Sequence, residues 1–285
     1  MSRERCASRG SLLMPVLHVV VPFYNEPDTL EPCLRRVLAV KLPPLWIMRL
    51  TIVDDHSEPE ARADAERAVH RLTQDGAPIQ LLRHDANRGK GAALRTGFDA
   101  VLERAHEDDL LIIQDGDLEY DPSDYPTLMH PILQGRTTAV IGTRWGPHRP
   151  IKGLKRRIHA CGNRMLSRLS NLMTGYQLHD MECCYKLFTI DLLRRMRPLL
   201  TEDRFGVEPQ IVAALARLGQ RVVEVPISYE PRGFSAGKKI GWIDGVRALY
   251  VISRERLRRA RSSPSHAQRE TGEEVPSASQ PERTR

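Results

Sequence analysis

The sequence lacks several features, and each absence narrows the classes of protein to which the chain can belong. No apolar run approaches the roughly 18 to 20 residues that a membrane-spanning helix needs, and no secretory signal peptide is present. The five cysteines show neither a disulfide framework nor zinc-ligand spacing. Aromatic residues make up only 5% of the chain, which leaves few rings for stacking on nucleic-acid bases. We therefore expect a cytoplasmic protein that keeps its thiols reduced and does not cross a bilayer.

Acidic residues are missing altogether from one long segment, residues 135–178. Nine basic residues lie in the same segment and outnumber the net charge of +7: Arg136, Arg144, Arg149, Lys152, Lys155, Arg156, Arg157, Arg164 and Arg168. This imbalance indicates an anionic partner, which could be nucleic acid, phospholipid headgroups or a phosphorylated substrate. The alternative is a solvated helix face, but such faces usually include balancing acids.

The length and composition fit one large α/β domain. The chain has 285 residues, of which 41% are hydrophobic, so it can build a sizeable core. We expect a flexible leader over residues 1–15, a catalytic domain over residues 16–257 and a disordered basic and polar tail over residues 258–285.

Short apolar runs alternate with helical patterns through the first half of the chain. The expected strands are Leu17–Val21, Leu50–Val53, Ile79–Leu82, Leu110–Ile113 and Ala139–Gly142. Asp28 and Glu31 are expected to form a capping box at the first helix. This alternation predicts a mainly parallel, Rossmann-like central sheet flanked by helices, with ligands bound where the strands end.

Three carboxylates follow the fourth apolar run: Asp115, Asp117 and Glu119. In an extended segment, residues at this spacing share one face, so their mutual repulsion must be relieved. A divalent cation such as Mg²⁺ or Mn²⁺ would do so, because hard oxygen ligands suit these ions. An acidic turn that merely ends a strand is the alternative.

A glycine-rich turn, Asn87–Gly91, opens the helix that follows the third run. Glycine allows close approach of the backbone to a ligand, and a helix N-terminus favours anions. The turn matches neither the P-loop nor the dinucleotide-binding pattern. Phosphate binding and simple turn packing therefore both remain open for Gly89, Gly91 and Gly97.

Taken together, the ends of the first four runs resemble family 2 glycosyltransferases. The motifs occur in the family's order and spacing: Pro22-Phe23-Tyr24-Asn25-Glu26, Asp54-Asp55-His56-Ser57, Asn87-Arg88-Gly89-Lys90-Gly91-Ala92 leading to Gly97, and Asp115-Gly116-Asp117. The resemblance implies the GT-A fold, a nucleotide-sugar donor, a Mg²⁺ or Mn²⁺ cofactor at the D-x-D motif and inversion at the anomeric carbon.

The resemblance also implies roles for individual residues. The nucleoside would be held by Pro22, Tyr24, Glu26 and Asp55, with Lys90 close by. Asp115 would contact the ribose or the metal shell, while Asp117 and Glu119 would ligate the metal. The family often has Gln at the position of Glu119.

The second half resembles polyprenyl-phosphate glycosyltransferases of the dolichol-phosphate mannose or glucose synthase type. The stretches that carry this likeness are 142–163, 180–188, 205–210, 225–232 and 237–245. In such enzymes, arginines matching Arg144 and Arg157 bind the lipid phosphate, a task that suits the guanidinium fork. Cys161 stands where a hydroxyl residue is expected. The resemblance places Arg232 and Lys238 at the donor's diphosphate.

The chemistry of such a transfer depends on the acceptor. A lipid phosphate is ionised at neutral pH and needs no strong general base, so the main demand is to stabilise the departing nucleoside diphosphate. A metal at Asp117 together with Arg232 and Lys238 would supply that charge. A sugar hydroxyl would instead require a carboxylate base, for which Asp180 is the candidate. Asp180 could equally be a helix cap or the partner of an arginine.

We therefore predict a metal-dependent, inverting hexosyltransferase that uses a donor of the UDP-glucose or GDP-mannose type and a polyprenyl phosphate acceptor. The alternative is a family 2 enzyme acting on a saccharide or small soluble hydroxyl acceptor. A nucleic-acid-binding module would leave the strand-end motifs unexplained, so no nucleic-acid partner is expected. A catalytically idle scaffold would not need intact Asp115 and Asp117.

The C-terminal part of the domain carries an apolar stripe and then a basic run. The stripe comprises Trp242, Val246, Leu249, Tyr250 and Ile252, and Arg254, Arg256, Arg258, Arg259 and Arg261 follow it. Such a segment can rest on an anionic membrane surface, which would place the protein at the inner face of the membrane. A last helix packed on the sheet is the other interpretation.

Overall fold

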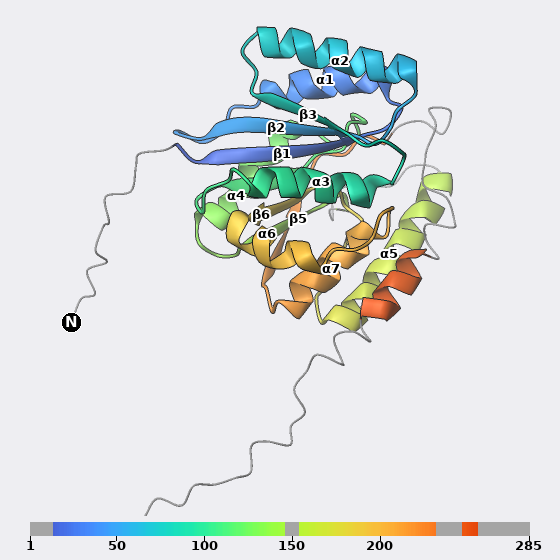
Figure 1. The fold of residues 1–285 in the computed structure, drawn as a ribbon. Helices are drawn as coiled ribbons and strands as arrows, with labels where there is room; N and C mark the ends of the chain where they lie inside the picture. The colour runs from blue at the N-terminus through green and yellow to red at the C-terminus, as the bar shows by residue number, and fades with distance from the viewer. Residues whose placement is uncertain (1–13, 146–153, 232–246, 256–285) are drawn as a thin grey trace, which may run out of the picture.

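The computed structural model describes residues 14–145, 154–231 and 247–255, with the backbone alone for residues 154–159 (Figure 1). Its strands are β1 (Val16–Phe23), β2 (Ile47–Asp54), β3 (Ile79–Arg83), β4 (Leu110–Ile113), β5 (Ala139–Thr143), β6 (Lys186–Thr189) and β7 (Val222–Pro226). They form one seven-stranded sheet in the order β3-β2-β1-β4-β6-β5-β7.

Seven labelled α-helices surround this sheet in the described part of the chain: α1 (Pro27–Leu38), α2 (Pro59–Gln74), α3 (Lys90–Leu102), α4 (Tyr125–Leu133), α5 (Leu154–Thr174), α6 (Ile190–Met196) and α7 (Val207–Arg217). Two short 3₁₀ helices, η1 (Pro122–Asp124) and η2 (Arg197–Leu199), join them. A further helix covers residues 247–255. In Figure 1, α1 and α2 lie on one side of β1, β2 and β3, and α3 lies on the other.

The central strands are buried because the helices cover both faces of the sheet. All four residues of β4 are buried, and so are seven of the eight residues of β1. Such continuous apolar runs are typical of parallel strands that are covered on both sides. The α3 helix packs closely on β1, because a Cβ at Gly97 would lie 2.4 Å from Cγ1 of Val20.

The prediction of a mainly parallel sheet is confirmed. β1 pairs in parallel with β2 and β4, β2 with β3, and β5 with β7. β6 is antiparallel to both β4 and β5. Its first residue, Lys186, therefore lies beside Ile141 near the end of β5, so the start of β6 meets the carboxyl ends of its neighbours.

The expected capping box at the first helix is wrong. The helix begins at Pro27, so Asp28 lies inside its first turn; the N-cap residue Glu26 accepts a hydrogen bond from the Thr29 hydroxyl at 2.9 Å, but its side chain caps no backbone amide. Glu31 instead forms ion pairs with Arg35 on the same helix and with Arg71 on α2. Proline at the first helical position replaces the capping residue, since its missing N–H would have had no partner there.

The acidic stretch after β4 is a turn, as the alternative interpretation had it, and not the extended segment on which the shared face of the three carboxylates was based. The strand ends at Ile113, and residues 116–117 form a turn. Leu118 adopts a positive φ of 64°, and Asp117 Oδ1 accepts a hydrogen bond from the Glu119 amide at 3.1 Å. A local side-chain bond of this type competes with strand pairing and reverses the chain.

None of the helices within the described ranges combines the length and the hydropathy that crossing a membrane requires.

Candidate active site

The ends of β1 and β2 carry the first two motifs, and their turns interlock. The Asn25 amide donates to Ser57 Oγ at 2.9 Å, and the Glu58 amide donates to Asn25 Oδ1 at 2.7 Å. Asn25 and His56 both have positive φ, at 49° and 63°. The structure thus holds the end of β1, with Pro22, and the turn after it, with Tyr24 and Glu26, against the end of β2; all three residues are partly buried.

Asp55 joins the end of β2 to the glycine-rich turn. Its carboxylate accepts hydrogen bonds from the Arg88 amide at 2.9 Å and the Gly89 amide at 2.6 Å, and it lies 2.7 Å from Nδ1 of His84. The carboxylate is almost fully buried. In this structure, Asp55 therefore shapes the turn that opens α3.

The glycines of this turn are needed for close backbone packing. Gly89 has a φ of +98°, and a Cβ at Gly91 would lie only 2.2 Å from the carbonyl oxygen of Glu202. The Ala92 amide donates to the Asp203 carbonyl at 3.0 Å. The segment around residues 202–204 consequently lies directly against the N-terminus of α3, which a side chain at either glycine would prevent.

Lys90, the first residue of α3, is placed next to the D-x-D motif. Its Nζ lies 2.8 Å from Oδ1 and 3.0 Å from Oδ2 of Asp115, and 2.9 Å from Oε1 of Glu208. Glu208 also forms a buried ion pair with Lys186. Burial alone would lower the pKa of Lys90, but the charges of Asp115 and Glu208 raise it well above its usual value.

Glu208 and Lys186 were not singled out as site residues from the sequence. Each lies within a stretch that resembles the family, but only their burial and pairing show their importance. Lys186 is fully buried and the side chain of Glu208 is 3% exposed. Charged residues are rarely buried to this degree unless they are paired, so the pairing is the signal that sequence alone could not supply.

The buried side chain of Gln114 connects the D-x-D turn to two tyrosines through hydrogen bonds. Tyr125 and Tyr185 donate to Gln114 Oε1 at 2.7 Å and 2.8 Å, and Gln114 Nε2 donates to the Asp115 carbonyl at 2.8 Å. These groups are buried, so the network rigidifies the backbone that carries Asp115.

The predicted metal ligands offer hard oxygen donors at this turn. Within the described ranges, no three acidic, histidine or cysteine side chains are arranged to hold a metal ion. Glu119 Oε2 accepts a hydrogen bond from the Tyr229 hydroxyl at 2.7 Å. The carboxylates of Asp115 and Asp117 still fit Mg²⁺ or Mn²⁺ chemically, because these ions bind through few carboxylates plus water and substrate phosphates.

Arg144 follows β5 and forms a two-point ion pair with Asp180. Its Nε and Nη2 each donate to the carboxylate at 2.7 Å, and its amide donates at 3.1 Å. Asn163 Nδ2 donates to the same carboxylate at 2.8 Å. The guanidinium carbon also lies 5.2 Å from the ring centre of Tyr229.

Of the three open interpretations of Asp180, as a base, a helix cap or the partner of an arginine, the structure supports the partner of an arginine. Asp180 is fully buried. Burial would raise its pKa, but the charge and hydrogen bonds of Arg144 lower it below the usual value. A carboxylate with a lowered pKa is a poor proton acceptor near neutral pH.

Glu182 lies two residues further along the same loop and was not predicted from the sequence. It is partly buried, and its Oε1 has no hydrogen-bond partner among the described residues. Burial raises the pKa of Glu182 to about 7; the charge of Glu208 adds to this rise, whereas Lys186 and Arg144 oppose it. A carboxyl with such a pKa is suited to proton transfer near pH 7.

Three of the predicted site residues lie wholly or partly outside the described part of the chain. The side chain of Arg157, on α5, lies outside the described part of the chain, and so do Arg232 and Lys238 altogether. Cys161, on the same helix as Arg157, is exposed.

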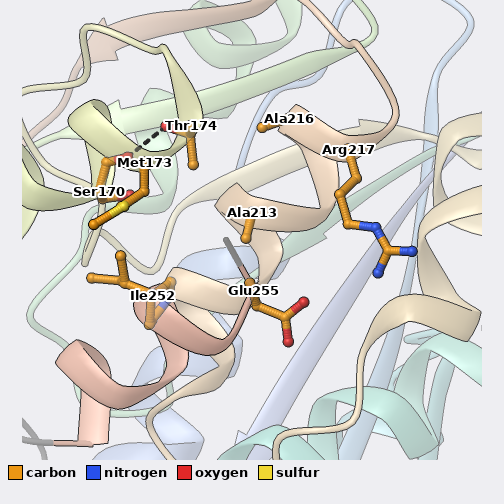
Figure 2. Close-up of a pocket in the computed structure, with 9 residues that line it drawn as sticks. Ser170, Met173, Thr174, Ala213, Ala216, Arg217, Ile252 and Glu255 are labelled. Carbon is orange, nitrogen blue, oxygen red and sulfur yellow. Dashed lines mark hydrogen bonds between the residues drawn. The ribbon is translucent and has the colours of Figure 1, made fainter. Parts of the chain in front are cut away.

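A separate pocket lies between α5, α7 and the helix of residues 247–255 (Figure 2). Its lining includes Met173, Ala213, Ala216, Ile252 and Glu255. Because none of the strand-end motifs contributes to it, this pocket belongs to the packing of the C-terminal helix. Within the described residues, that helix packs on α5 and α7.

Comparisons with known proteins agree with the family that the strand-end motifs predict. The model of glycosyl transferase family 2 matches residues 18–197. An undecaprenyl-phosphate mannosyltransferase from Micrococcus luteus is 31% identical over 238 residues, which cover 81% of this chain and 90% of that protein. A dodecaprenyl-phosphate galacturonate synthase from Rhizobium johnstonii is 28% identical over 225 residues, which cover 78% of this chain but only 61% of that protein.

Solved structures support the fold. Glucosyl-3-phosphoglycerate synthase from Mycobacterium tuberculosis, in complex with UDP, superposes with a TM-score of 0.61 at 18% identity and covers 90% of this chain and 87% of that one. The same enzyme has been solved with Mg²⁺ and UDP. At this identity the likeness shows the fold alone, which is the predicted GT-A fold.

Proposed function

This chain belongs to glycosyl transferase family 2, and we propose that it is a metal-dependent, inverting hexosyltransferase acting on a polyprenyl phosphate. The donor would be a nucleotide-diphosphate sugar of the UDP-glucose or GDP-mannose type. The observation that carries the proposal is the position of Tyr229, whose hydroxyl binds Glu119 of the acidic turn and whose ring faces Arg144. Tyr229 therefore contacts both the acidic turn, which is suited to the donor's metal, and Arg144, which is suited to binding a phosphate.

The reaction joins an oxygen of the acceptor phosphate to C1 of the sugar while the bond from C1 to the nucleoside diphosphate breaks. The leaving diphosphate takes the bonding electrons, so positive charge near it lowers the barrier. A metal held by Asp115 and Asp117 would supply part of that charge. The ammonium of Lys90, which lies against Asp115, would contribute further positive charge near the leaving diphosphate.

Arginines would hold the acceptor phosphate in line with the sugar. Asp180 fixes the plane of the Arg144 guanidinium through two of its five N–H groups, and the acceptor phosphate would bind at the remaining edge. Arg157 would provide the second contact. Such orientation needs no proton transfer, because the phosphate is already ionised. Arg232 and Lys238 would complete the donor side at the diphosphate.

The acceptor's lipid implies contact with a membrane, and α5 has a suitable face. Its buried side carries the small polar residues Asn163, Ser167 and Ser170. Its exposed side instead presents Met165 and Leu172, which are 59% and 74% exposed, together with Arg164 and Arg168. Apolar and basic side chains on one exposed helix face suit an anionic lipid surface, and we propose a peripheral location there.

A second candidate, transfer to a hydroxyl acceptor, is favoured by Glu182. A hydroxyl must lose its proton as it attacks, and Glu182, with a pKa of about 7, is better suited to accept that proton than Asp180 is.

One experiment tests the leading proposal. The protein is incubated with Mn²⁺ or Mg²⁺, a panel of UDP- and GDP-sugars and a short polyprenyl phosphate, and glycosyl-phospholipid is sought. A lipid product is expected with at least one donor. Transfer to a soluble acceptor with no lipid product from any donor would overturn it.

Two variants then separate the candidates. Arg157→Ala should strongly reduce transfer to a phosphate acceptor and leave transfer to a hydroxyl acceptor little changed. Glu182→Gln should strongly reduce transfer to a hydroxyl acceptor and leave transfer to a phosphate acceptor little changed.

A further inference from the structure

A chain of alternating charges runs from the D-x-D turn into the core. It begins with Asp115, continues through Lys90 and Glu208, and ends at Lys186, whose Nζ also donates to the Cys183 carbonyl. The exposed fractions of the side chains fall along this chain from 21% at Asp115 to none at Lys186. We refer to these four residues as the ion chain.

The first link of the ion chain concerns a predicted metal ligand. The ammonium of Lys90 lies within 3.0 Å of both carboxylate oxygens of Asp115. Both oxygens that could bind a cation are thus already neutralised by a cation of the chain itself. A divalent ion would have to compete with this ammonium for the same carboxylate.

The later links keep Lys90 in place. Glu208 Oε1 lies 2.9 Å from the ammonium of Lys90, and Lys186 holds Glu208 by a buried ion pair. Glu208 sits in the first turn of α7, and Lys186 begins β6. Both side chains are buried, so Lys90 can release Asp115 and still keep one buried counter-charge.

We propose that Lys90 and the divalent metal compete for Asp115, and that Glu208 is the positioning residue that retains Lys90 during the exchange. The inference rests on the proposed function, because it takes Asp115 as part of the metal site. In the absence of donor, Lys90 holds Asp115 and metal binds weakly. A bound nucleoside diphosphate offers new anionic oxygens to both cations, so Lys90 turns toward it and Asp115 becomes available.

The consequence is coupling between metal and nucleotide. If the diphosphate relieves the competition, it must tighten metal binding, and metal must tighten nucleotide binding by the same factor. Removing the Lys90 charge should strengthen metal binding without nucleotide and shrink this factor.

The test measures Mn²⁺ binding to the full chain by electron paramagnetic resonance, with and without saturating UDP. In the unchanged protein, UDP is expected to lower the Mn²⁺ Kd at least ten-fold. In Lys90→Met, the Kd for Mn²⁺ alone should fall about ten-fold and the effect of UDP should shrink. Lys90→Arg keeps the charge and should bind Mn²⁺ alone as weakly as the unchanged protein.

Glu208→Gln tests the positioning role. Without its charge, Asp115 becomes the sole anionic partner of Lys90 in the ion chain, so Mn²⁺ alone should bind several-fold more weakly, opposite to Lys90→Met. The double variant Glu208→Gln/Lys186→Met leaves no buried charge unpaired and should behave likewise if the single variant fails to fold. Arg36→Met removes an exposed charge outside the ion chain and should change the Kd less than two-fold.

The outcomes separate the two proposals. If the unchanged protein binds no Mn²⁺ even with UDP, the metal-dependent function is overturned and the inference with it. If it binds Mn²⁺ but Lys90→Met leaves the Kd for Mn²⁺ alone unchanged or raises it, the inference alone is overturned. Equal changes of the Mn²⁺ Kd in Lys90→Met and Arg36→Met would show a general effect of the protein's net charge and would also overturn the inference.

Discussion

Asp180 binds Arg144 through two parallel hydrogen bonds of 2.7 Å, which join the end of β5 to the loop before β6. The Asp180 side chain is fully buried and that of Arg144 is 10% exposed. Each charge therefore depends on the other for its neutralisation, and the guanidinium has one defined plane.

Asp180→Asn should destabilise the protein by about 3 kcal/mol, because it leaves the Arg144 charge buried without its counter-charge. Urea unfolding of both proteins measures the difference. Asp191→Asn is the matched control, since its ion pair with Arg195 is exposed at the surface, and a change below about 0.5 kcal/mol is expected there. Equal effects from the two substitutions would contradict the importance of the buried pair.

Glu182→Gln should make stability less dependent on pH. The pKa of Glu182 rises from 4.5 to about 7 on folding. A carboxyl with a raised pKa favours the folded state below the unfolded pKa, and this contribution is lost as pH rises through the folded value. The variant should therefore gain about 2 kcal/mol over the unchanged protein between pH 5 and pH 8, as judged by urea unfolding at both. A constant difference across that range would show that Glu182 ionises normally.

Gly97→Ala should cost about 2 kcal/mol of stability, because its Cβ would clash with Val20 in the buried strand β1. Gly162→Ala is the control: its Cβ would meet nothing within 4 Å, and it lies within α5. Alanine favours a helix over glycine, so this variant should gain about 0.5–1 kcal/mol. Thermal unfolding of both variants checks the opposite signs.

Asp117→Asn should reduce turnover more than about a hundred-fold with either class of acceptor, since it removes a predicted metal ligand. Asp121→Asn is a suitable control from the same loop, because Asp121 caps η1 and asparagine caps equally well. Initial rates at saturating donor compare the two. Turnover by Asp117→Asn at the unchanged rate would refute the metal assignment.

Loss of the exposed apolar residues of α5 should weaken membrane binding. Met165→Ser together with Leu172→Ser is expected to lower binding to vesicles of phosphatidylglycerol and phosphatidylcholine about ten-fold. Leu133→Ser changes an exposed leucine of α4 and should have no such effect. Co-sedimentation at low and high salt provides the measurement, and equal losses in the two proteins would rule out α5 as the membrane-facing helix.

The sequence by itself was enough to predict the alternating strands and helices, the mainly parallel sheet and the family. These follow from local patterns: apolar runs define buried strands, and polar motifs at their ends meet at one edge whenever the strands are parallel. The sequence did not reveal that β6 runs antiparallel, and it did not decide between an extended acidic segment and the turn that residues 116–117 form. Strand direction depends on neighbours that are distant along the chain, and a turn depends on side-chain bonds to the backbone.

The pairing of charges was decided by the tertiary structure alone. Lys90 meets Asp115 across 25 positions, Lys186 meets Glu208 across 22, and Arg144 meets Asp180 across 36. No periodicity relates such residues, because they come together only when separate strands and helices pack. Burial then makes each pairing strong, since an unpaired charge in the interior is costly. The residue types at the strand ends therefore follow from the sequence, whereas which carboxylate neutralises which cation follows from the fold.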